Sequence, residues 1–147
     1  MATRSVIAKL DENGIKAVYC HNDGYLAHVG TVLDSHYQDE DRVDELLSYG
    51  DLSFLDENIG EKIDFDDIEV RNKNKQCMFY ARDRDEKSER RKPIILQDDI
   101  ALVEFAIKVC DADFIYMYAY GAWYVYDYSK DNQFVELDDV LTKVYKD

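Results

Sequence analysis

The sequence has little proline, glycine and cysteine, and it lacks a long hydrophobic run. Six glycines and one proline among 147 residues exclude a collagen-like or low-complexity chain. The longest uncharged run, residues 114–126, is much shorter than the roughly 18–20 apolar residues that a membrane helix requires, so we expect no membrane span. No segment repeats with a period of ~20–50 residues, which excludes solenoids and propellers.

Cysteine is also scarce. Cys20, Cys77 and Cys110 are an odd number of cysteines at wide spacings. This pattern fits neither a disulfide framework nor a zinc site built from paired cysteines, so we expect reduced thiols. The N-terminal segment has no apolar stretch of the signal-peptide type, and alanine at position 2 excludes N-myristoylation. These features predict a cytoplasmic protein, and no motif indicates a cofactor.

Negative charge dominates the composition. The chain has 18 Lys and Arg against 32 Asp and Glu, and its formal net charge is −14. Such a charge repels phosphate backbones, which argues against direct binding to nucleic acid through a basic face. The distribution is uneven, because residues 71–95 carry nine basic and four acidic side chains. We therefore expect a basic loop within an acidic protein.

Length and patterning predict one α+β domain over residues 1–147, since 46% hydrophobic residues suffice for a single core. The pattern predicts an antiparallel sheet of about five strands covered by about three to four helices. The helix from residue 98 to 109 is apolar on most of its circumference, so we expect it to be buried on most sides. The expected strands are 5–10, 15–21 and 77–81 with a C-terminal hairpin over 114–128, and the expected helices are 26–37, 41–49, 98–109 and 138–145. We expect a loop with a short irregular strand over 51–70 and a charged loop over 82–92.

The C-terminal hairpin permits a prediction of register. A two-residue type II′ turn at residues 121–122 pairs Tyr120 with Trp123 and Tyr118 with Val125. Because Tyr and Trp dominate interface hot spots, the aromatic face that results is a candidate surface for binding a partner. The alternative is that a neighbouring helix covers it. The aromatic residues on this face are Tyr116, Tyr118, Tyr120 and Trp123.

Acidic runs are a second candidate contact. A rigid array of carboxylates resembles the phosphates of a nucleic acid and fits the basic groove of a nucleic-acid-binding protein, with association weakened by salt. The alternative is that the acidic side chains only keep the protein dissolved. The carboxylates expected to bind a partner are Asp39, Glu40, Asp41, Asp66 and Asp67.

The charged loop after residue 81 indicates a candidate ligand site. Arginines there can hold a phosphate or a carboxylate, while Asp83 serves as an acid or base. Combined with the histidine-containing segment, this gives a small nucleotide- or metal-handling enzyme as the alternative function. An enzyme is less favoured, because there is no phosphate-binding glycine loop and no HExxH or GxSxG motif, and the histidine spacing predicts no metal site. The candidate residues are His21, Asp23, Tyr25, Arg82, Asp83 and Arg84.

Six short segments, in order along most of the chain, carry a resemblance. They are Ala-Thr-Arg-Ser-Val-Ile-Ala at 2–8, Tyr-Cys-His-Asn-Asp-Gly-Tyr at 19–25, His-Tyr at 36–37, Gly-Asp-Leu-Ser at 50–53, Arg-Asp-Arg-Asp-Glu at 82–86 and Trp-Tyr-Val at 123–125. Together they resemble a family of small acidic proteins encoded by tailed phages and prophages. The chain departs from the family pattern at Asn22, where many relatives have an aromatic residue, and at Leu26, where proline is frequent. The resemblance implies an accessory protein in a bacterial cytoplasm that binds and modulates a host protein.

Overall fold

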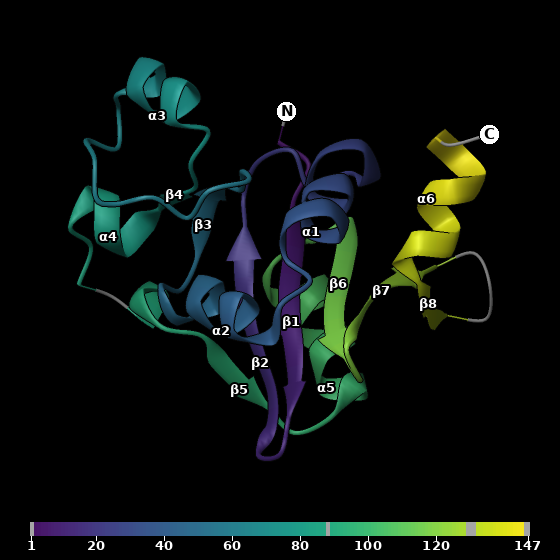
Figure 1. Ribbon diagram of the computed structural model, residues 1–147. Helices are drawn as coiled ribbons and strands as arrows, with labels where there is room; N and C mark the ends of the chain where they lie inside the picture. Colours follow the sequence, from purple (N-terminus) through teal and green to yellow (C-terminus); the bar gives the residue numbers. More distant parts are fainter. Residues whose placement is uncertain (1, 88, 129–131, 146–147) are drawn as a thin grey trace.

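A mixed sheet forms the centre of the computed structural model, which describes residues 2–87, 89–128 and 132–145 (Figure 1). Within these residues the sheet has eight strands in the order β4-β3-β2-β1-β6-β7-β8, and β5 pairs with β2 outside this path. The strands are β1 (Ser5–Asp11), β2 (Gly14–Cys20), β3 (Leu52–Phe54), β4 (Met78–Phe79), β5 (Ile94–Leu96), β6 (Phe114–Ala119), β7 (Ala122–Asp127) and β8 (Gln133–Glu136).

Six α-helices and three other helical segments accompany the sheet in the described part of the chain. Two of the three segments are π-helical, and each is continuous with an α-helix. The α-helices are α1 (Thr31–His36), α2 (Glu40–Ser48), α3 (Ile68–Asn74), α4 (Tyr80–Arg84), α5 (Asp99–Glu104) and α6 (Leu137–Tyr145). The other segments are the π-helices η1 (Leu26–Gly30) and η3 (Phe105–Val109) and the 3₁₀-helix η2 (Glu89–Arg91).

The α+β class is as predicted, but the antiparallel sheet of five strands is wrong. The N-terminal hairpin is present, with Ser5 opposite Cys20 and Asp11 opposite Gly14. However, β1 runs parallel to β6, and β2 runs parallel to β3. Hydrophobic alternation reports the face on which a side chain lies and not the direction of the neighbouring strand, so it could not distinguish these pairings.

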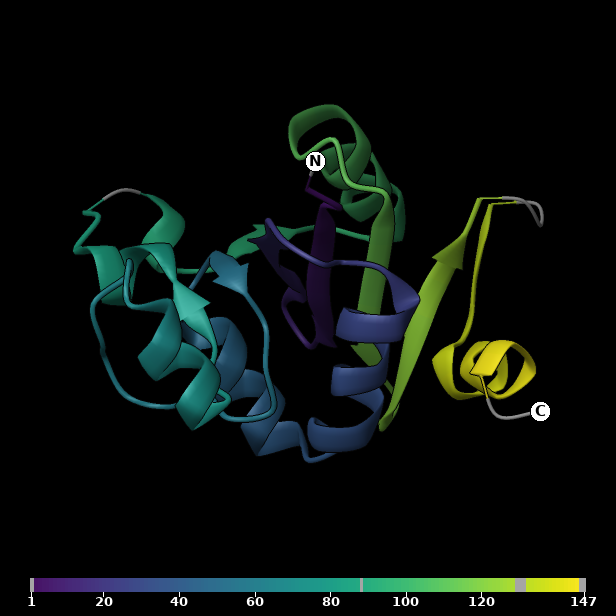
Figure 2. The ribbon, with the colours of Figure 1, turned by 90° about the horizontal axis from the view of Figure 1, so that it is seen from above.

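The helices form two unequal layers. Figure 2 shows α1, α2 and α6 on one face of the sheet, and α5 with η3 on the other. A large core that includes Ile7, Leu33, Tyr116 and Trp123 fills the first side. A smaller core lies under α5 and η3. The sheet therefore has one well-covered face and one face with a single helical segment over it.

The helix predicted at 98–109 is present as α5 and η3, but its expected burial is wrong. Leu102 and Ala106 are buried, whereas Ile100 is 70% exposed and Val109 is 73% exposed. Among the described residues no other helix covers the outer side of this segment, so that side stays exposed (Figure 2). Apolar residues all round a helix are therefore not sufficient evidence of burial on all sides.

The C-terminal hairpin is present with a different register. Tyr118 pairs with Trp123, and the turn is formed by Tyr120 and Gly121, whose φ angles are 54° and 79°. Two consecutive residues with positive φ make a turn of the type I′ class, whose twist matches that of the strands. The predicted type II′ turn is therefore wrong by one residue, although Tyr116, Tyr118 and Trp123 do share one face.

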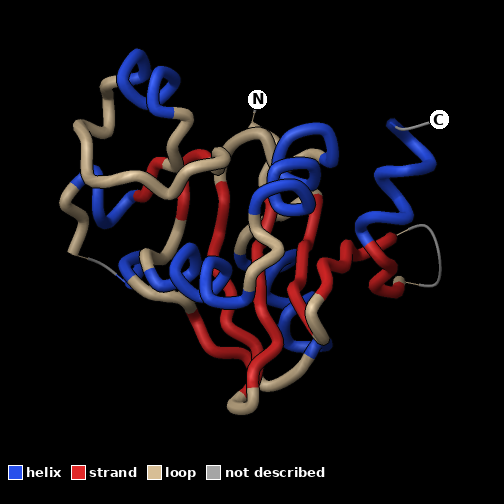
Figure 3. Tube along the Cα trace, viewed as in Figure 1, coloured by secondary structure: helices blue, strands red, loops and turns tan. Residues whose placement is uncertain are grey.

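The stretch between β3 and β5 contains the α-helices α3 and α4 and the 3₁₀-helix η2 (Figure 3). We had predicted a loop with a short irregular strand over 51–70, a strand over 77–81 and a charged loop over 82–92. The helix α3 begins at its cap Asp67, whose side chain accepts a hydrogen bond of 3.1 Å from the N–H of Val70. The predicted strand 77–81 is reduced to β4, because α4 begins at Tyr80. Ser88 of the predicted charged loop lies outside the described residues.

Candidate functional site

A cleft of about 660 Å³ lies at one end of the sheet, where β1 begins and β2 ends. We call it the arginine cleft, because three arginines from distant parts of the chain line it. The remaining lining residues come from β2, α4, η3 and the connections beside them. The residues that line the arginine cleft are Arg4, Tyr19, His21, Asp51, Tyr80, Arg84, Arg90, Phe105, Val109, Cys110 and Asp111.

Backbone contacts hold the segment around Arg90 against the sheet. The Asp51 N–H donates a hydrogen bond of 2.8 Å to the carbonyl of Arg90. Gly50 has a φ of +80°, and a Cβ at this position would clash with the same carbonyl. Glycine therefore allows η2 to approach the start of β3 closely, which brings Arg90 to the cleft.

Tyr19 and His21 form a hydrogen-bonded pair in the cleft. The Tyr19 hydroxyl lies 2.6 Å from Nδ1 of His21. Burial, followed by the positive charges of Arg4 and Arg90, lowers the pKa of His21 below its ordinary value. The imidazole is consequently neutral at neutral pH, and it carries one ring N–H.

Tyr80 supports two of the arginines. Its ring centroid lies 4.8 Å from the guanidinium carbon of Arg84 and 4.3 Å from that of Arg90. Arg84 also binds Glu86, with its Nη2 at 2.6 Å from the carboxylate. Burial raises the pKa of Asp51, although the Tyr19 N–H and the Arg90 charge act in the opposite direction. The cleft thus combines three arginines with two carboxyls: Asp51, whose charged form is disfavoured by burial, and the exposed Asp111, which lies 3.4 Å from Arg4.

The predicted ligand site is only partly assembled. His21 and Arg84 both line the arginine cleft, whereas Asp23 and Tyr25 are not among its lining residues. Arg82 points elsewhere and donates to the carbonyls of Ile59, Gly60 and Cys77. The six predicted residues therefore do not form one site.

Asp83 has a structural role. It is 4% exposed, and its carboxylate accepts hydrogen bonds from the N–H of Phe79 at 2.8 Å and of Ile63 at 3.1 Å. Arg82 Nε lies 3.0 Å from the same carboxylate. Its acceptor capacity is thus used to hold α4 against the strand before it, and the predicted acid or base function is not available to a ligand.

The histidines are dispersed. His28 lies 2.7 Å from the carbonyl of Leu55, and Nε2 of His36 lies 3.5 Å from the Glu57 carboxylate. Among the residues that the structure describes, no group of three or more His, Cys, Asp or Glu side chains is placed to hold a metal ion. The cysteines Cys20, Cys77 and Cys110 are free and buried.

The predicted aromatic contact face is covered by helices. Tyr116, Tyr118 and Trp123 are at most 5% exposed, and each donates a hydrogen bond to a backbone carbonyl on the helical side. These three rings cannot contact a partner. Tyr120, which was predicted beside them, is 88% exposed at the tip of the hairpin.

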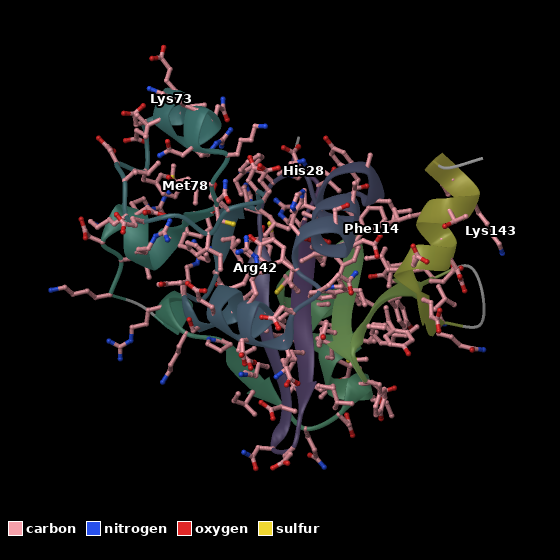
Figure 4. All side chains as sticks on the ribbon, viewed as in Figure 1. His28, Arg42, Lys73, Met78, Phe114 and Lys143 are labelled. Atoms are coloured by element: carbon pink, nitrogen blue, oxygen red, sulfur yellow. The ribbon has the colours of Figure 1, made fainter. Side chains whose placement is uncertain are left out.

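The predicted acidic residues lie at the surface in two places. Asp39, Glu40 and Asp41 are exposed at the start of α2, and Asp66 is exposed before α3. Asp67 is half-buried, since it caps α3. Charged side chains project from the whole molecule, as Lys73 on α3 and Lys143 on α6 illustrate at its periphery (Figure 4).

A second depression, which the sequence did not reveal, lies on the sheet face that carries α5. We call it the tyrosine groove; its volume is about 810 Å³. Its floor is formed by Met117, Tyr124, Tyr126 and Phe134 of β6, β7 and β8, and α5 forms one wall. Figure 2 shows that β7 and β8 extend beyond the area that α5 covers. The groove exists because the sheet is wider than its helical cover.

Carboxylates and an exposed tyrosine border the tyrosine groove. Asp98, Asp99 and Glu104 line the side formed by α5, and Tyr120 lines the side formed by the hairpin turn. The groove could not be predicted because its outer strand, β8, was not recognised. Residues 133–136 include too few apolar positions for a strand to be identified by alternation.

Comparisons with protein-family models, with curated proteins and with solved structures find no match to this chain. Among the helices that the structure describes, none has the length and apolar character needed to cross a membrane.

Proposed function

We propose that the protein is a phage-type accessory protein that binds and modulates a host protein, and that the tyrosine groove is the surface that binds it. The proposal rests on one observation above all: the apolar face of β7 and β8 beside α5 is left open. Tyr124, Tyr126 and Phe134 are only partly buried there. Partly buried aromatic residues in a concave surface are typical anchors of protein interfaces.

The conformation of Tyr120 supports this assignment. Tyr120 has a positive φ of 54°, and its side chain is 88% exposed. Asparagine or glycine is favoured at such a turn position, because other residues are strained by about 1–2 kcal/mol there. A tyrosine that neither packs in the core nor suits the local backbone is explained by contact with another molecule.

The charge around the tyrosine groove defines the partner. Asp98, Asp99 and Glu104 lie beside the aromatic floor, and the whole chain has a net charge of −14. A partner segment with basic side chains around an apolar or aromatic anchor complements this surface, and its association is accelerated by electrostatic steering. The acidic run at Asp39–Asp41 lies on α2, on the opposite face of the sheet (Figure 2). We therefore place the docking surface at the groove and not on that run.

A photo-crosslinking amino acid at position 120 tests the proposal in a bacterial lysate. We expect one crosslinked host protein with a basic segment, and its yield should fall as the salt concentration rises. A second variant with the same amino acid at Val144, which is 55% exposed on α6, is the matched control. Equal crosslinking at positions 120 and 144, a yield that does not depend on salt, or no crosslinked protein would contradict the proposal.

The substitution Tyr126→Ala tests independently whether the floor of the tyrosine groove contacts the partner. Removing a hot-spot ring weakens binding by about 2 kcal/mol or more, so crosslinking from position 120 should be lost at low protein concentration. An unchanged crosslinking yield would show that the groove floor does not contact the partner.

A further inference from the structure

We propose that the arginine cleft binds a small phosphate monoester. This site is separate from the tyrosine groove, and the proposal does not depend on the proposed function. Arg4, which directly precedes β1, Arg84 from α4 and Arg90 from η2 all line the cleft. Three guanidinium groups from distant parts of the chain meet there in a protein whose formal net charge is −14. Arginine is the side chain best suited to phosphate, because its planar group donates two parallel hydrogen bonds.

The pair formed by Tyr19 and His21 adds one more donor. A hydrogen bond of 2.6 Å joins the Tyr19 hydroxyl to Nδ1 of His21. If the hydroxyl donates, the proton of the neutral ring is on Nε2; if Nδ1 donates, the hydroxyl proton is not used within the pair. In both arrangements the pair has one proton left for an acceptor in the cleft. The cleft therefore contains several donors for an oxyanion. Two carboxyls also line it, with Asp111 at 3.4 Å from Arg4 and Asp51 at 3.8 Å from Arg90, and a phosphate competes with them for the arginines.

An internal carboxylate already lies between two of the arginines. Glu86 accepts hydrogen bonds from Nε of Arg84 at 3.1 Å and from Nη2 at 2.6 Å. The same carboxylate oxygen lies 4.0 Å from Nη1 of Arg90. The spacing of Arg84 and Arg90 thus suits one oxyanion between them. A phosphate monoester carries more negative charge than a carboxylate and displaces Glu86 from this position.

The walls and the size of the cleft indicate a small ligand. Tyr80, Phe105 and Val109 supply an apolar wall, and the volume of about 660 Å³ exceeds the volume of a phosphate group alone. An organic group attached to the phosphate therefore has a surface to pack against. Long polyanions are disfavoured, because the remainder of the protein carries a strongly negative charge.

Amide NMR titrations with inorganic phosphate, adenosine 5′-monophosphate and acetate at constant ionic strength test this site. We expect both phosphates to shift the resonances of Tyr19, His21 and Arg84, with the nucleotide bound more tightly and acetate bound more weakly. The substitution Arg84→Gln should weaken phosphate binding about tenfold or more, since a hydrogen bond to a charged group is lost. Arg84 is partly exposed, so this substitution leaves the core intact.

Two further variants make the result specific. Arg91→Gln removes the same charge from the neighbouring exposed position of η2, which does not line the cleft, and it should leave affinity unchanged. Glu86→Gln removes the internal competitor and should tighten phosphate binding. The proposal is overturned if phosphate causes no shifts beyond those of sodium chloride, if acetate binds as tightly as phosphate, or if Arg91→Gln weakens binding as much as Arg84→Gln. Weaker binding by the Glu86→Gln variant would overturn the displacement of Glu86.

Discussion

The indole N–H of Trp123 donates a hydrogen bond of 2.8 Å to the backbone carbonyl of Tyr37. The hydroxyl of Tyr37 donates in turn to the carbonyl of Asp56 at 2.7 Å. Trp123 lies on β7, Tyr37 directly follows α1, and Asp56 follows β3. Both aromatic rings are buried, so these bonds join three distant parts of the chain inside the larger core.

We expect Trp123→Phe to lower the free energy of unfolding by about 1–3 kcal/mol, because the carbonyl of Tyr37 is left buried without its donor. Urea unfolding followed by circular dichroism measures the change. Tyr25→Phe is the control, since Tyr25 is 41% exposed and loses only a surface hydroxyl. Equal stability of the wild type and the Trp123→Phe variant would contradict the structural role of this bond.

Asp83→Ala should be much more damaging than its position in a charged loop suggests. The substitution leaves the N–H groups of Phe79 and Ile63 without their acceptor. It also removes the carboxylate that pairs with the guanidinium group of Arg82. Breaking a buried pair in this way costs about 3–5 kcal/mol. Thermal unfolding tests the expectation, with Glu45→Ala on the exposed side of α2 as the control. A decrease in thermal stability no larger than that of the Glu45→Ala control would show that Asp83 does not hold α4 in place.

Tyr120→Asn should separate stability from function. Asparagine tolerates the positive φ of this turn, so we expect the free energy of unfolding to rise by about 0.5–1 kcal/mol. Binding of the host protein to the tyrosine groove should weaken at the same time. Tyr120→Phe is the matched control, because it keeps both the aromatic ring and the positive φ of 54°, so its free energy of unfolding should stay close to that of the wild type. If the Tyr120→Asn variant is less stable than the wild type and binds the host protein equally well, the argument that Tyr120 is retained for contact is wrong.

The pH dependence of stability should report His21. The folded state holds the pKa of His21 below its ordinary value of 6.5, first through burial and then through Arg4 and Arg90. The unfolded chain therefore binds more protons as the pH falls, so the contribution of His21 to stability is complete above pH 6.5 and is lost as the pH falls toward the folded-state pKa. The difference in unfolding free energy between the wild type and His21→Gln, measured across this range, should decrease on acidification.

NMR titration of the His21 ring gives an independent measurement of the same effect. We expect Arg4→Gln to raise the pKa of His21 toward its ordinary value, because one of the two neighbouring positive charges is removed. Arg91→Gln should leave this pKa unchanged, since Arg91 does not line the cleft. A pKa of His21 that does not respond to Arg4→Gln would exclude the electrostatic contribution of that arginine.

Long elements with a clear period could be predicted from the sequence. The hairpin of β1 and β2 follows from alternation and a glycine turn, and α2 and α6 follow from helical spacing of apolar residues. Short elements could not, because β4 has two residues and β8 has four, which is too few to define a period. The turn at Tyr120 was missed because its positive φ contradicts the local preference of tyrosine.

The residues of the candidate sites were also predictable only in part. His21 and Arg84 were recognised as residues able to bind a ligand, but Arg4 and Arg90 joined them only through the fold, since positions 4, 21, 84 and 90 meet where β1 begins and β2 ends. Arg82 and Asp83 have the same chemistry as the charged residues beside them in the sequence. However, their side chains form hydrogen bonds with backbone groups of the protein, and these bonds could not be predicted from the sequence.

The composition and residue periods predicted an acidic α+β protein and the rings that share a face of the C-terminal hairpin, since charge and residue period are local properties of a chain. Which of those faces is covered depends on the packing of the helices. Three helical elements bury Tyr116, Tyr118 and Trp123 on one side, while α5 and η3 leave Tyr124, Tyr126 and Phe134 partly open on the other. Burial depends on the width of the sheet and on the placement of helices far away in the chain, and no local pattern of residues contains that information.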